Sequence, residues 1–430
     1  MSIPSTSVKW MYAGMTGAPV LDNNWGDLTT LLRACAVTGF NLRPVQAITC
    51  SGSTATVRCN GHGFIAHQVV RIEGADPTGY NGEHRIVSVV DANTVTITLA
   101  AALAPASAAA GQTLQMRAAP LGFESLFDDG GQKLVLRSTN VQSPRNVLRV
   151  DASCPTNYTT TYAKFGRVTM AQGMSDLDTF VGARAPYDPS SPTKNEVPSG
   201  SGSSVYGGWF RWYYARNSDA SGVADNGAVT SGARKWILVG DDRGFYLLTT
   251  TVPTSNTWRS CYVFSDFSSL QSPDAYATLL AAHNKYVTAG SAFDLRDSGT
   301  LVRSTATEPH IIMRDHTGEG GNVYGSMRSL NVTGGAFTSG FSTSVPYPNG
   351  PGGSLLVHPV WIQHADGNIR GRLPGVYHLL HNTTLTDLSI VDGKLPAPDR
   401  KLLIADVNSQ PGASSKSQIA LDITGPWGRE

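Results

Sequence analysis

The sequence predicts a mainly β protein with several β-sandwich or β-barrel domains, one N-terminal helix and a second short helix. Glycine and proline are frequent, with 45 and 24 of the 430 residues, and this composition indicates many turns. In the first third of the chain, runs rich in β-branched residues follow one another about every 8–12 residues, a spacing typical of a sandwich or small barrel. A chain of this length can also form more than one core.

We expect three regions along the chain. The first, 1–45, is an N-terminal segment with a helix over 24–38. The second, 46–117, is a small β-barrel or β-sandwich module, and the third, 118–430, is a larger β-rich domain. No internal repeat with a fixed period is visible.

The helix over 24–38 is predicted because apolar side chains recur at helical spacing. These positions are Leu28, Leu31, Leu32, Cys35 and Ala36. Asn24 or Asp22 could cap its start, and Gly39 fits the position just past its end. The second helix is predicted over 273–284, with Pro273 in its first turn and Asp274 near the positive end of its dipole.

Strands account for most of the remaining predictions. In the module they are expected at 48–49, 55–58, 68–73, 84–90, 94–99 and 113–116. In the larger domain they are expected at 133–137, 147–150, 209–214, 235–239, 245–250, 258–264, 355–358, 376–380, 402–407 and 418–424. Two long polar loops, 186–204 and 341–354, interrupt the larger domain, and we expect both to be mobile and able to order on assembly.

Charge and composition exclude several classes of partner. The 33 basic and 32 acidic residues give a formal charge of +1, and no basic block marks a nucleic-acid surface. No apolar run approaches 18 residues, so no membrane segment is expected, and the N-terminus lacks the apolar run of a secretory signal. The five cysteines include no C-x-x-C pair, and we expect free thiols in a protein made in the cytoplasm.

The stretch Gly61-His62-Gly63-Phe64-Ile65-Ala66 fits the spacing of a dinucleotide-binding turn. Such a turn needs a helix directly after it, but a β-branched run begins at Gln68, and Pro77 prevents a helix further on. We therefore interpret the two glycines as a bend with positive φ angles and expect no bound nucleotide.

Other residues that could carry chemistry favour structural roles. Four histidines, His358, His364, His378 and His381, lie close together in sequence, but no Cys or acidic ligand stands at zinc-like spacing. The acidic pairs are Asp128-Asp129, Asp176/Asp178 and Asp241-Asp242, and their glycine-rich surroundings indicate turn caps. No G-x-S-x-G elbow is present. We therefore expect no catalytic residue, cofactor or metal, and a protein that is not an enzyme.

The most unusual stretch is the aromatic run 209–214. Alternation places Trp209, Arg211 and Tyr213 on one face of a strand, and Phe210, Trp212 and Tyr214 on the other. Trp209, Arg211, Trp212 and Tyr213 are the candidate interface or ligand-binding residues, since such side chains anchor interfaces. The alternative, which we favour, is a strand buried on both faces.

Three parts of the sequence resemble virion proteins of tailed bacteriophages and prophages. HGFIAHQVVRIEGADPTGYNGEHRIVSVVDANTVTITL is similar to a small β module common in them. YAGMTGAPVLDNNWGDLTTLLRACAVTGFN resembles their beginning, and GRLPGVYHLLHN and ALDITGPWG resemble their ends. The resemblance names no catalytic residue.

The resemblance implies a structural subunit of a phage particle, in the tail, baseplate or neck. Such a subunit would form a symmetric homo-oligomer and bind other virion proteins. A receptor- or glycan-binding component at the outer part of the virion is an alternative, and a cell-envelope glycan hydrolase is a further one. The expected location is the virion, with contact to the host surface in the alternative.

Overall fold

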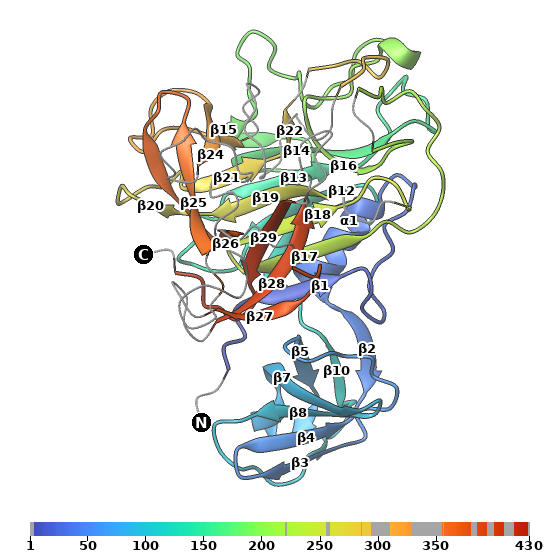
Figure 1. Ribbon diagram of the computed structural model, residues 1–430, viewed down its shortest axis with the longest axis vertical. Helices are drawn as coiled ribbons and strands as arrows, with labels where there is room; N and C mark the ends of the chain where they lie inside the picture. The colour runs from blue at the N-terminus through green and yellow to red at the C-terminus, as the bar shows by residue number, and fades with distance from the viewer. Residues whose placement is uncertain are drawn as a thin grey trace.

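The computed structural model describes residues 4–219, 222–254, 259–284, 286–293, 310–328, 355, 357–379, 385–393, 400–407 and 417–428. Figure 1 shows a large body of stacked strands and a smaller β lobe below it. We call this lobe, residues 40–118, the module. The fold is mainly β, as the sequence predicts. None of the described helices is long and apolar enough to cross a membrane.

The module is one antiparallel sheet whose strands curl around a small apolar core. In sheet order the strands are β2 (Phe40–Pro44), β10 (Gln115–Ala118), β5 (Val69–Glu73), β7 (Gly82–Asp91), β8 (Thr94–Thr98), β4 (Thr54–Arg58) and β3 (Ala47–Ser51). Strand β7 pairs with β5 through its first residues and with β8 through its last, so it joins the two halves of the sheet. β6 (Ala75–Asp76), η2 (Thr78–Tyr80) and β9 (Ser107–Ala108) complete the module.

The body contains two large antiparallel sheets. The first has the order β11 (Phe123–Asp128), β12 (Lys133–Ser138), β13 (Val147–Asp151), β14 (Lys164–Met174), β16 (Phe210–Ala215) and β22 (His283–Asn284), and β15 (Phe180–Ala185) pairs with β14. The second has the order β1 (Lys9–Tyr12), β17 (Trp236–Asp241), β18 (Gly244–Thr249), β19 (Ser260–Asp266), β21 (Thr278–Ala281), β23 (His310–Ile312), β24 (Val323–Arg328), β25 (Val357–His364), β26 (Ile369–Leu379), β29 (Ser417–Asp422), β28 (Arg400–Val407) and β27 (Ile390–Gly393). β20 (Ser268–Ser269) also pairs with β26, and η3 (Gly202–Ser204) lies outside the sheets.

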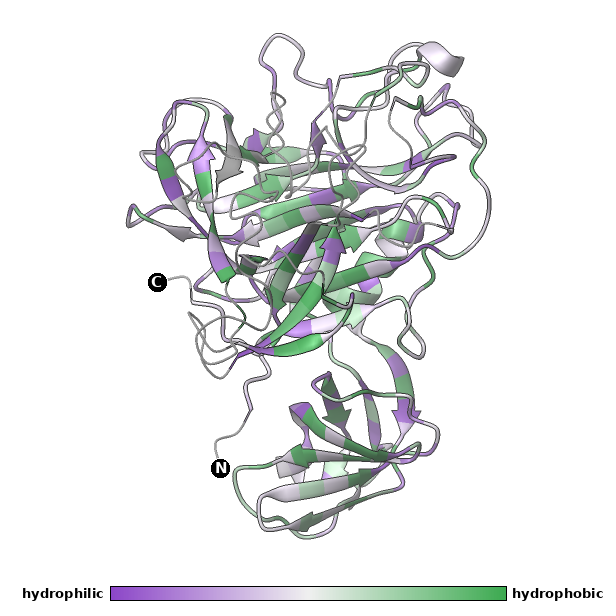
Figure 2. Cartoon of the chain, viewed as in Figure 1, coloured by the Kyte–Doolittle hydropathy of each residue, from purple (hydrophilic) through white to green (hydrophobic). Residues whose placement is uncertain are grey.

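Aromatic side chains hold the two sheets of the body together as a sandwich. Trp212 of the first sheet stacks on Tyr262 of the second, with ring centres 5.7 Å apart. Phe245 meets both Trp212 and Phe123 edge to face, at 6.0 and 5.8 Å. Such contacts add to the burial of apolar area. Figure 2 shows apolar residues concentrated on the stacked central strands, with polar residues more frequent in the loops.

The N-terminal helix forms where the sequence predicts it, but with different ends. α1 (Asp27–Leu32) continues directly into a π-helical stretch, η1 (Arg33–Thr38), and the predicted apolar stripe is buried. The predicted cap is wrong, because Gly26 precedes the helix without a side-chain cap. Instead, the Asp27 carboxylate accepts hydrogen bonds from the backbone N–H groups of Asp22 and Asn24, both at 3.0 Å. Gly39 ends the helix with φ +75°, as expected.

The second predicted helix, over 273–284, is wrong. This stretch instead contains the strands β21 and β22. Asp274 does not support a helix start, since its carboxylate is held by the guanidinium of Arg370 through two hydrogen bonds of 3.0 and 2.8 Å. The pairing of these strands with their neighbours and the long-range ion pair between Asp274 and Arg370 outweigh the local sequence signal for a helix start.

Most predicted strands of the body, from β12 and β13 to β28 and β29, are confirmed at their centres, while the strand predicted over 355–358 overlaps β25 only from residue 357 on. The five cysteines are free, as expected; Cys35, Cys59 and Cys261 are buried, while Cys50 and Cys154 are half-buried. The loop 186–204 lies within the described residues. The loop 341–354 lies outside them.

The module packs against the body through the N-terminal segment and the residues that follow β29. The guanidinium of Arg85 donates hydrogen bonds to the carbonyl oxygens of Ser5 at 2.7 Å, Val8 at 2.9 Å, Thr424 at 3.1 Å and His67 at 2.7 Å. Burial lowers the pKa of Arg85 to about 10. The buried apolar residues of module and body form one continuous cluster. Arg85 therefore links the module to both ends of the chain.

Candidate functional site

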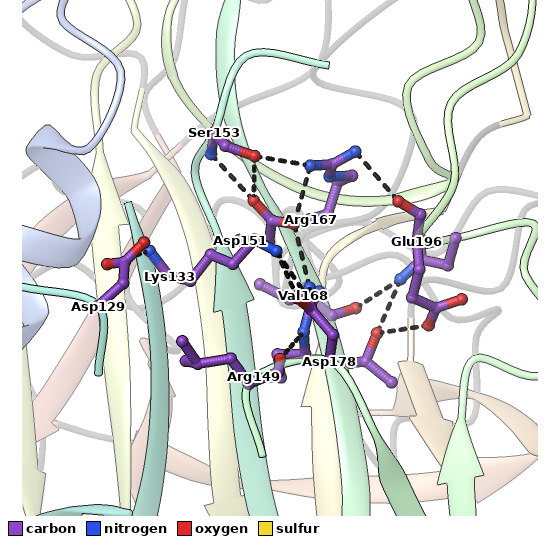
Figure 3. Close-up of polar contacts among 12 residues, drawn as sticks. Asp129, Lys133, Arg149, Asp151, Ser153, Arg167, Val168, Asp178 and Glu196 are labelled. Carbon is purple, nitrogen blue, oxygen red and sulfur yellow. Dashed lines mark hydrogen bonds and ion pairs between the residues drawn. The ribbon is translucent and has the colours of Figure 1, made fainter. Parts of the chain in front are cut away.

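Figure 3 shows a group of charged side chains on the first sheet of the body. Lys133 of β12, Arg149 and Asp151 of β13, and Arg167 of β14 extend from neighbouring strands, and Asp178 joins them from the β14–β15 turn. Adjacent strands place side chains of one face about 5 Å apart, so a row of Lys, Arg and Asp across three strands forms one network. We call these five residues the charged cluster.

Asp151 lies at the centre of the charged cluster. Its carboxylate is 2.8 Å from Arg167 and 3.1 Å from Arg149, and it accepts a hydrogen bond of 3.0 Å from the backbone N–H of Ser153. Burial alone would raise the pKa of this carboxyl, but the two guanidinium groups and Ser153 together lower it to about 2. Asp151 is therefore an ionised carboxylate, and at 2% exposure it is out of reach of a substrate.

Asp178 closes the charged cluster on the solvent side. Its carboxylate accepts hydrogen bonds from Lys133 at 2.8 and 2.7 Å and from Arg149. The Asp178 side chain is 57% exposed, whereas that of Arg149 is 3% exposed. The guanidinium of Arg149 therefore connects a buried carboxylate to an exposed one, and its Nε also donates to the carbonyl of Leu177 at 2.7 Å.

The loop 186–204 crosses the sheet beside the charged cluster. Arg167 donates to the carbonyl oxygen of Glu196 at 3.2 Å, and the Thr169 hydroxyl donates to the Glu196 carboxylate at 3.2 Å. Burial raises the pKa of Glu196, and nearby Arg184 only partly offsets this effect. Asp151 and Glu196 thus have pKa values displaced in opposite directions, an arrangement that also occurs in acid–base catalysis. Because Asp151 is enclosed, the pair does not open onto a common cleft.

Asn195 fixes the same loop to the sheet. Its side-chain nitrogen donates to the carbonyl of Val168 at 2.9 Å and to the Thr169 hydroxyl at 3.0 Å. Its side-chain oxygen accepts from the backbone N–H groups of Trp209 at 3.0 Å and Phe210 at 2.9 Å. Asn195 is 2% exposed, and its amide makes four hydrogen bonds. The described loop is therefore held at its middle.

Lys194, next to Asn195, lies between two aromatic rings. Its ammonium is 4.5 Å from the ring centre of Trp209 and 4.4 Å from that of Tyr286. The Asp188 carboxylate lies 3.3 Å from the same ammonium, and the Tyr206 ring packs behind Tyr286. We call Trp209, Tyr286, Tyr206 and Asp188 the Lys194 cage. Rings on two sides and a carboxylate make a favourable site for a cation.

The candidate aromatic residues from the sequence lie in the interior. Trp209, Arg211, Trp212 and Tyr213 are 6%, 2%, 0% and 1% exposed, and every residue of β16 is buried. The alternative of a strand buried on both faces is therefore the arrangement in the structure. The Trp209 ring alone reaches a surface feature, because it forms one wall of the Lys194 cage.

Arg211 belongs to a second buried ionic group. Asp225 accepts hydrogen bonds from the Tyr213 hydroxyl at 2.6 Å and from Arg216 at 3.0 Å, and it lies 3.4 Å from Arg211. The Arg211 guanidinium also lies 4.7 Å from the Phe165 ring centre. Two guanidinium groups around one carboxylate fill the space between strands, so Arg211 has a structural role here.

The carboxylate pairs singled out in the sequence act largely as turn caps. Asp129 accepts from the backbone N–H groups of Gly131 and Lys133, at 2.8 and 2.9 Å. Asp176 accepts from the N–H groups of Asp178 and Thr179, both at 2.8 Å. Asp128 and Asp241 each cap a turn by accepting a hydrogen bond from a backbone N–H group. Asp128 also binds Arg33 through two hydrogen bonds of 2.6 Å.

The late histidines do not form a metal site in the part of the chain that the structure describes. No group of three or more His, Cys, Asp or Glu side chains there is arranged to hold a metal ion. His358 and His378 are cross-strand partners in β25 and β26, and burial lowers the pKa of His378 to about 3. His381 lies outside the described residues.

The Gly61–Ala66 stretch forms a bend, as the sequence predicts. Gly61 and Gly63 have φ angles of +58° and +62°. Between them, His62 accepts the backbone N–H of Phe64 at 2.8 Å and hydrogen-bonds the Asp91 carbonyl at 3.1 Å. No helix follows before β5, so the geometry of a dinucleotide turn is not formed.

Sequence reasoning missed the charged cluster, Asn195 and the Lys194 cage. The charged residues lie on strands β12, β13 and β14 and in the β14–β15 turn, where isolated Lys, Arg and Asp residues give no sign of their partners on other strands. Lys194 and Asn195 lie three and two residues before a Val-Pro pair in a polar loop, and such residues are typical of any solvated loop. Only the pairing of β14 with β16 brings the loop and the aromatic run together.

No protein-family model and no curated protein matches this sequence. Among solved structures, the chain is similar to the phage phi92 endosialidase, with 12% sequence identity and a TM-score of 0.16. The match covers 90% of this chain and 70% of that chain. The similarity is to a bacteriophage protein, and at this TM-score it carries no argument about the fold or activity of this chain.

This comparison contradicts one expectation from the sequence. The lack of a recognisable catalytic motif led to the expectation of a protein that is not an enzyme, whereas the similar structure is named as an endosialidase. We therefore withdraw that expectation. The physical reason for the error is that a motif search finds only catalytic residues at a known spacing in the sequence, so the lack of such a motif does not exclude an enzyme.

Proposed function

We propose that this chain is a structural component of a tailed-bacteriophage particle, in its tail, baseplate or neck. The three segments that resemble phage virion proteins are the start of the chain, the module and the end of the chain. The observation that carries the proposal is that the module segment contacts both of the others: Asn41 donates a hydrogen bond to the carbonyl of His62 at 2.7 Å, and Arg85 donates one to the carbonyl of Thr424 at 3.1 Å. The segments that carry the resemblance therefore act as one structural unit.

The proposed role involves a symmetric homo-oligomer and contacts with other virion proteins. The module is a compact lobe at one end of the molecule (Figure 1), and its position is fixed by buried contacts with the body. A lobe of fixed orientation can present the same surface in every copy, as repeated assembly around an axis requires.

The test is the composition and architecture of purified particles. Mass spectrometry and labelled antibodies on intact phage should detect the chain, and cryo-electron microscopy should show it in several symmetry-related copies. A chain that is absent from purified particles and remains a monomer at high concentration would overturn the proposal.

A second candidate function is binding of a polar ligand such as a host-surface glycan. The observation that favours it is a groove of about 630 Å³ in the module, lined by Arg71, Glu73, Asn81, Gln112 and Gln115 among others. Glu73 pairs with Arg71 at 2.9 Å and also with Arg117, so charged and amide groups converge there. Gln112→Ala combined with Arg71→Ala should reduce binding to host cells without altering the fold, and unchanged binding would dismiss this candidate.

A further inference from the structure

We propose that the Lys194 cage is a ligand site for a quaternary ammonium group, which the chain's own Lys194 occupies when no ligand is bound. This inference is independent of the particle role proposed above and can be tested on the isolated protein. It rests on the geometry of the rings, on the exposure of Lys194 and on how the loop is held.

The rings already hold a cation in the structure. Trp209 and Tyr286 flank the Lys194 ammonium at 4.5 and 4.4 Å, within the distance at which ring faces attract cations. Asp188 supplies a negative charge at 3.3 Å. A trimethylammonium group suits such a slot better than a primary ammonium, since it loses less hydration on entering and contacts both rings with its methyl groups.

Lys194 can leave the slot without moving the backbone. Its side chain is 25% exposed, and it forms its ion pair with Asp188 at the surface. The neighbouring Asn195 keeps its four hydrogen bonds to Val168, Thr169, Trp209 and Phe210 whichever rotamer Lys194 adopts. The walls of the cage are therefore preserved while the occupant changes.

Two hydrogen-bond donors on the aromatic side chains of the cage have no acceptor in the part of the chain that the structure describes. Trp209 Nε1 and the Tyr206 hydroxyl are buried and have no hydrogen-bond acceptor among the described residues. Buried donors are normally satisfied, so these atoms favour a ligand that carries an oxygen beside its ammonium. Choline has this combination, both as a free molecule and in phosphocholine groups, whereas trimethyl-lysine in proteins supplies the ammonium without the oxygen.

The chain's own lysine lowers the apparent affinity for any external ligand. When an internal group fills a site most of the time, the apparent affinity for a ligand equals the intrinsic affinity multiplied by the fraction of molecules whose site is empty. Removing the lysine should therefore strengthen binding, which is the opposite of what is expected if Lys194 itself contacted the ligand. This sign distinguishes the proposal from a simple surface contact.

The experiment titrates choline into the full chain by calorimetry at constant ionic strength. Lys194→Ala should bind choline about tenfold more tightly than the natural chain, because the cage is then empty. Lys194→Arg, which refills the cage with a cation, should bind no more tightly than the natural chain. Lys401→Ala removes an exposed lysine that pairs with Asp392 and should also leave choline binding unchanged.

Two further arms test the cation and the ring. The neutral isostere 3,3-dimethylbutan-1-ol should bind Lys194→Ala much more weakly than choline. Adding Tyr286→Ala should remove the gain, and because Tyr286 is 59% exposed this change should not affect folding, as thermal unfolding would verify. Equal binding of choline and its neutral isostere to Lys194→Ala, or no gain over the natural chain, would overturn the proposal.

The source of the ammonium is distinguished by two more titrants on Lys194→Ala. Tighter binding of phosphocholine than of choline would indicate a headgroup or a phosphocholine-decorated glycan. Tighter binding of a trimethyl-lysine peptide would indicate a methylated protein, and the negative charge of Asp188 beside the slot favours this ligand over one with an adjacent phosphate. Either result supports a quaternary ammonium site.

Discussion

Gly63 lies so close to Thr16 that a Cβ atom at position 63 would overlap the Thr16 side chain. Gly63 belongs to the bend before β5 in the module, and Thr16 belongs to the segment between β1 and α1 of the body. The bend that resembles a nucleotide motif is therefore a contact point between module and body. Its second glycine is required by this contact as well as by its φ of +62°.

Gly63→Ala should destabilise the protein more than Gly61→Ala. Both residues have positive φ, which costs about 1–2 kcal/mol for a residue with a Cβ atom. At Gly61 nothing lies within 4 Å of the added atom, whereas at Gly63 the overlap with Thr16 adds roughly 1–3 kcal/mol. Urea unfolding of the two variants checks the difference, and Thr16→Gly should restore part of the loss at Gly63 only. Equal losses at both glycines would contradict the contact.

Arg85→Lys should loosen the module from the body. Lysine keeps the charge but cannot reach the carbonyl oxygens of Ser5, Val8 and Thr424 together, because it lacks the planar fork of arginine. Leaving these oxygens unpaired should cost on the order of 2 kcal/mol or more. Hydrogen exchange should rise at residues 5–9 and 423–425. Arg71→Lys, whose side chain is half exposed, is the matched control and should change little.

The parts of the fold that depend on local patterns could be predicted from the sequence. The stripe from Leu28 to Ala36 predicts a helix because 3.6-residue spacing by itself defines a buried face. Strands such as β8 and β28 are predicted because β-branched residues bounded by turns favour an extended chain in most contexts. In both cases the signal and the structure lie within the same short segment.

The remaining features depend on partners far away in sequence. Strand β14 is buried along most of its length although it contains Lys164 and Arg167, because Asp151 of another strand compensates the charge of Arg167. The sequence predicts a mobile loop over 186–204 because its polar residues are typical of linkers, yet Asn195 holds this loop to β14 and β16. A local window cannot contain these partners, so neither the charged cluster nor the Lys194 cage could be predicted.

Asp151→Asn should lower the free energy of unfolding at neutral pH and should make this free energy depend less on pH in the acid range. Removing this charge leaves the buried guanidinium of Arg167 without its carboxylate and that of Arg149 with Asp178 alone, which should cost about 3–5 kcal/mol. In the folded protein the pKa of Asp151 is about 2, below its ordinary value of 3.8. Its contribution is therefore complete above the ordinary value and is lost as the pH falls towards 2.

The corresponding measurement is urea unfolding of both proteins from pH 6 down to pH 2. The stability difference between the natural chain and Asp151→Asn should be constant above about pH 5 and should shrink below about pH 4. Glu319→Gln, at an exposed carboxyl outside the charged cluster, should leave the profile unchanged. A difference that stays constant down to pH 2 would show that Asp151 is not the titrating group.

Asn195→Ala should release the loop 186–204 from the sheet. The substitution removes four hydrogen bonds and leaves the backbone N–H groups of Trp209 and Phe210 buried without an acceptor. The expected cost is on the order of 2–3 kcal/mol, and cleavage within the loop by a protease of broad specificity should become faster. Val197→Ala, an exposed position in the same loop, should alter neither quantity. Faster cleavage without a loss of global stability would mean that Asn195 fixes only the loop. Faster cleavage together with a loss of global stability would mean that the loop also supports the pairing of β14 with β16.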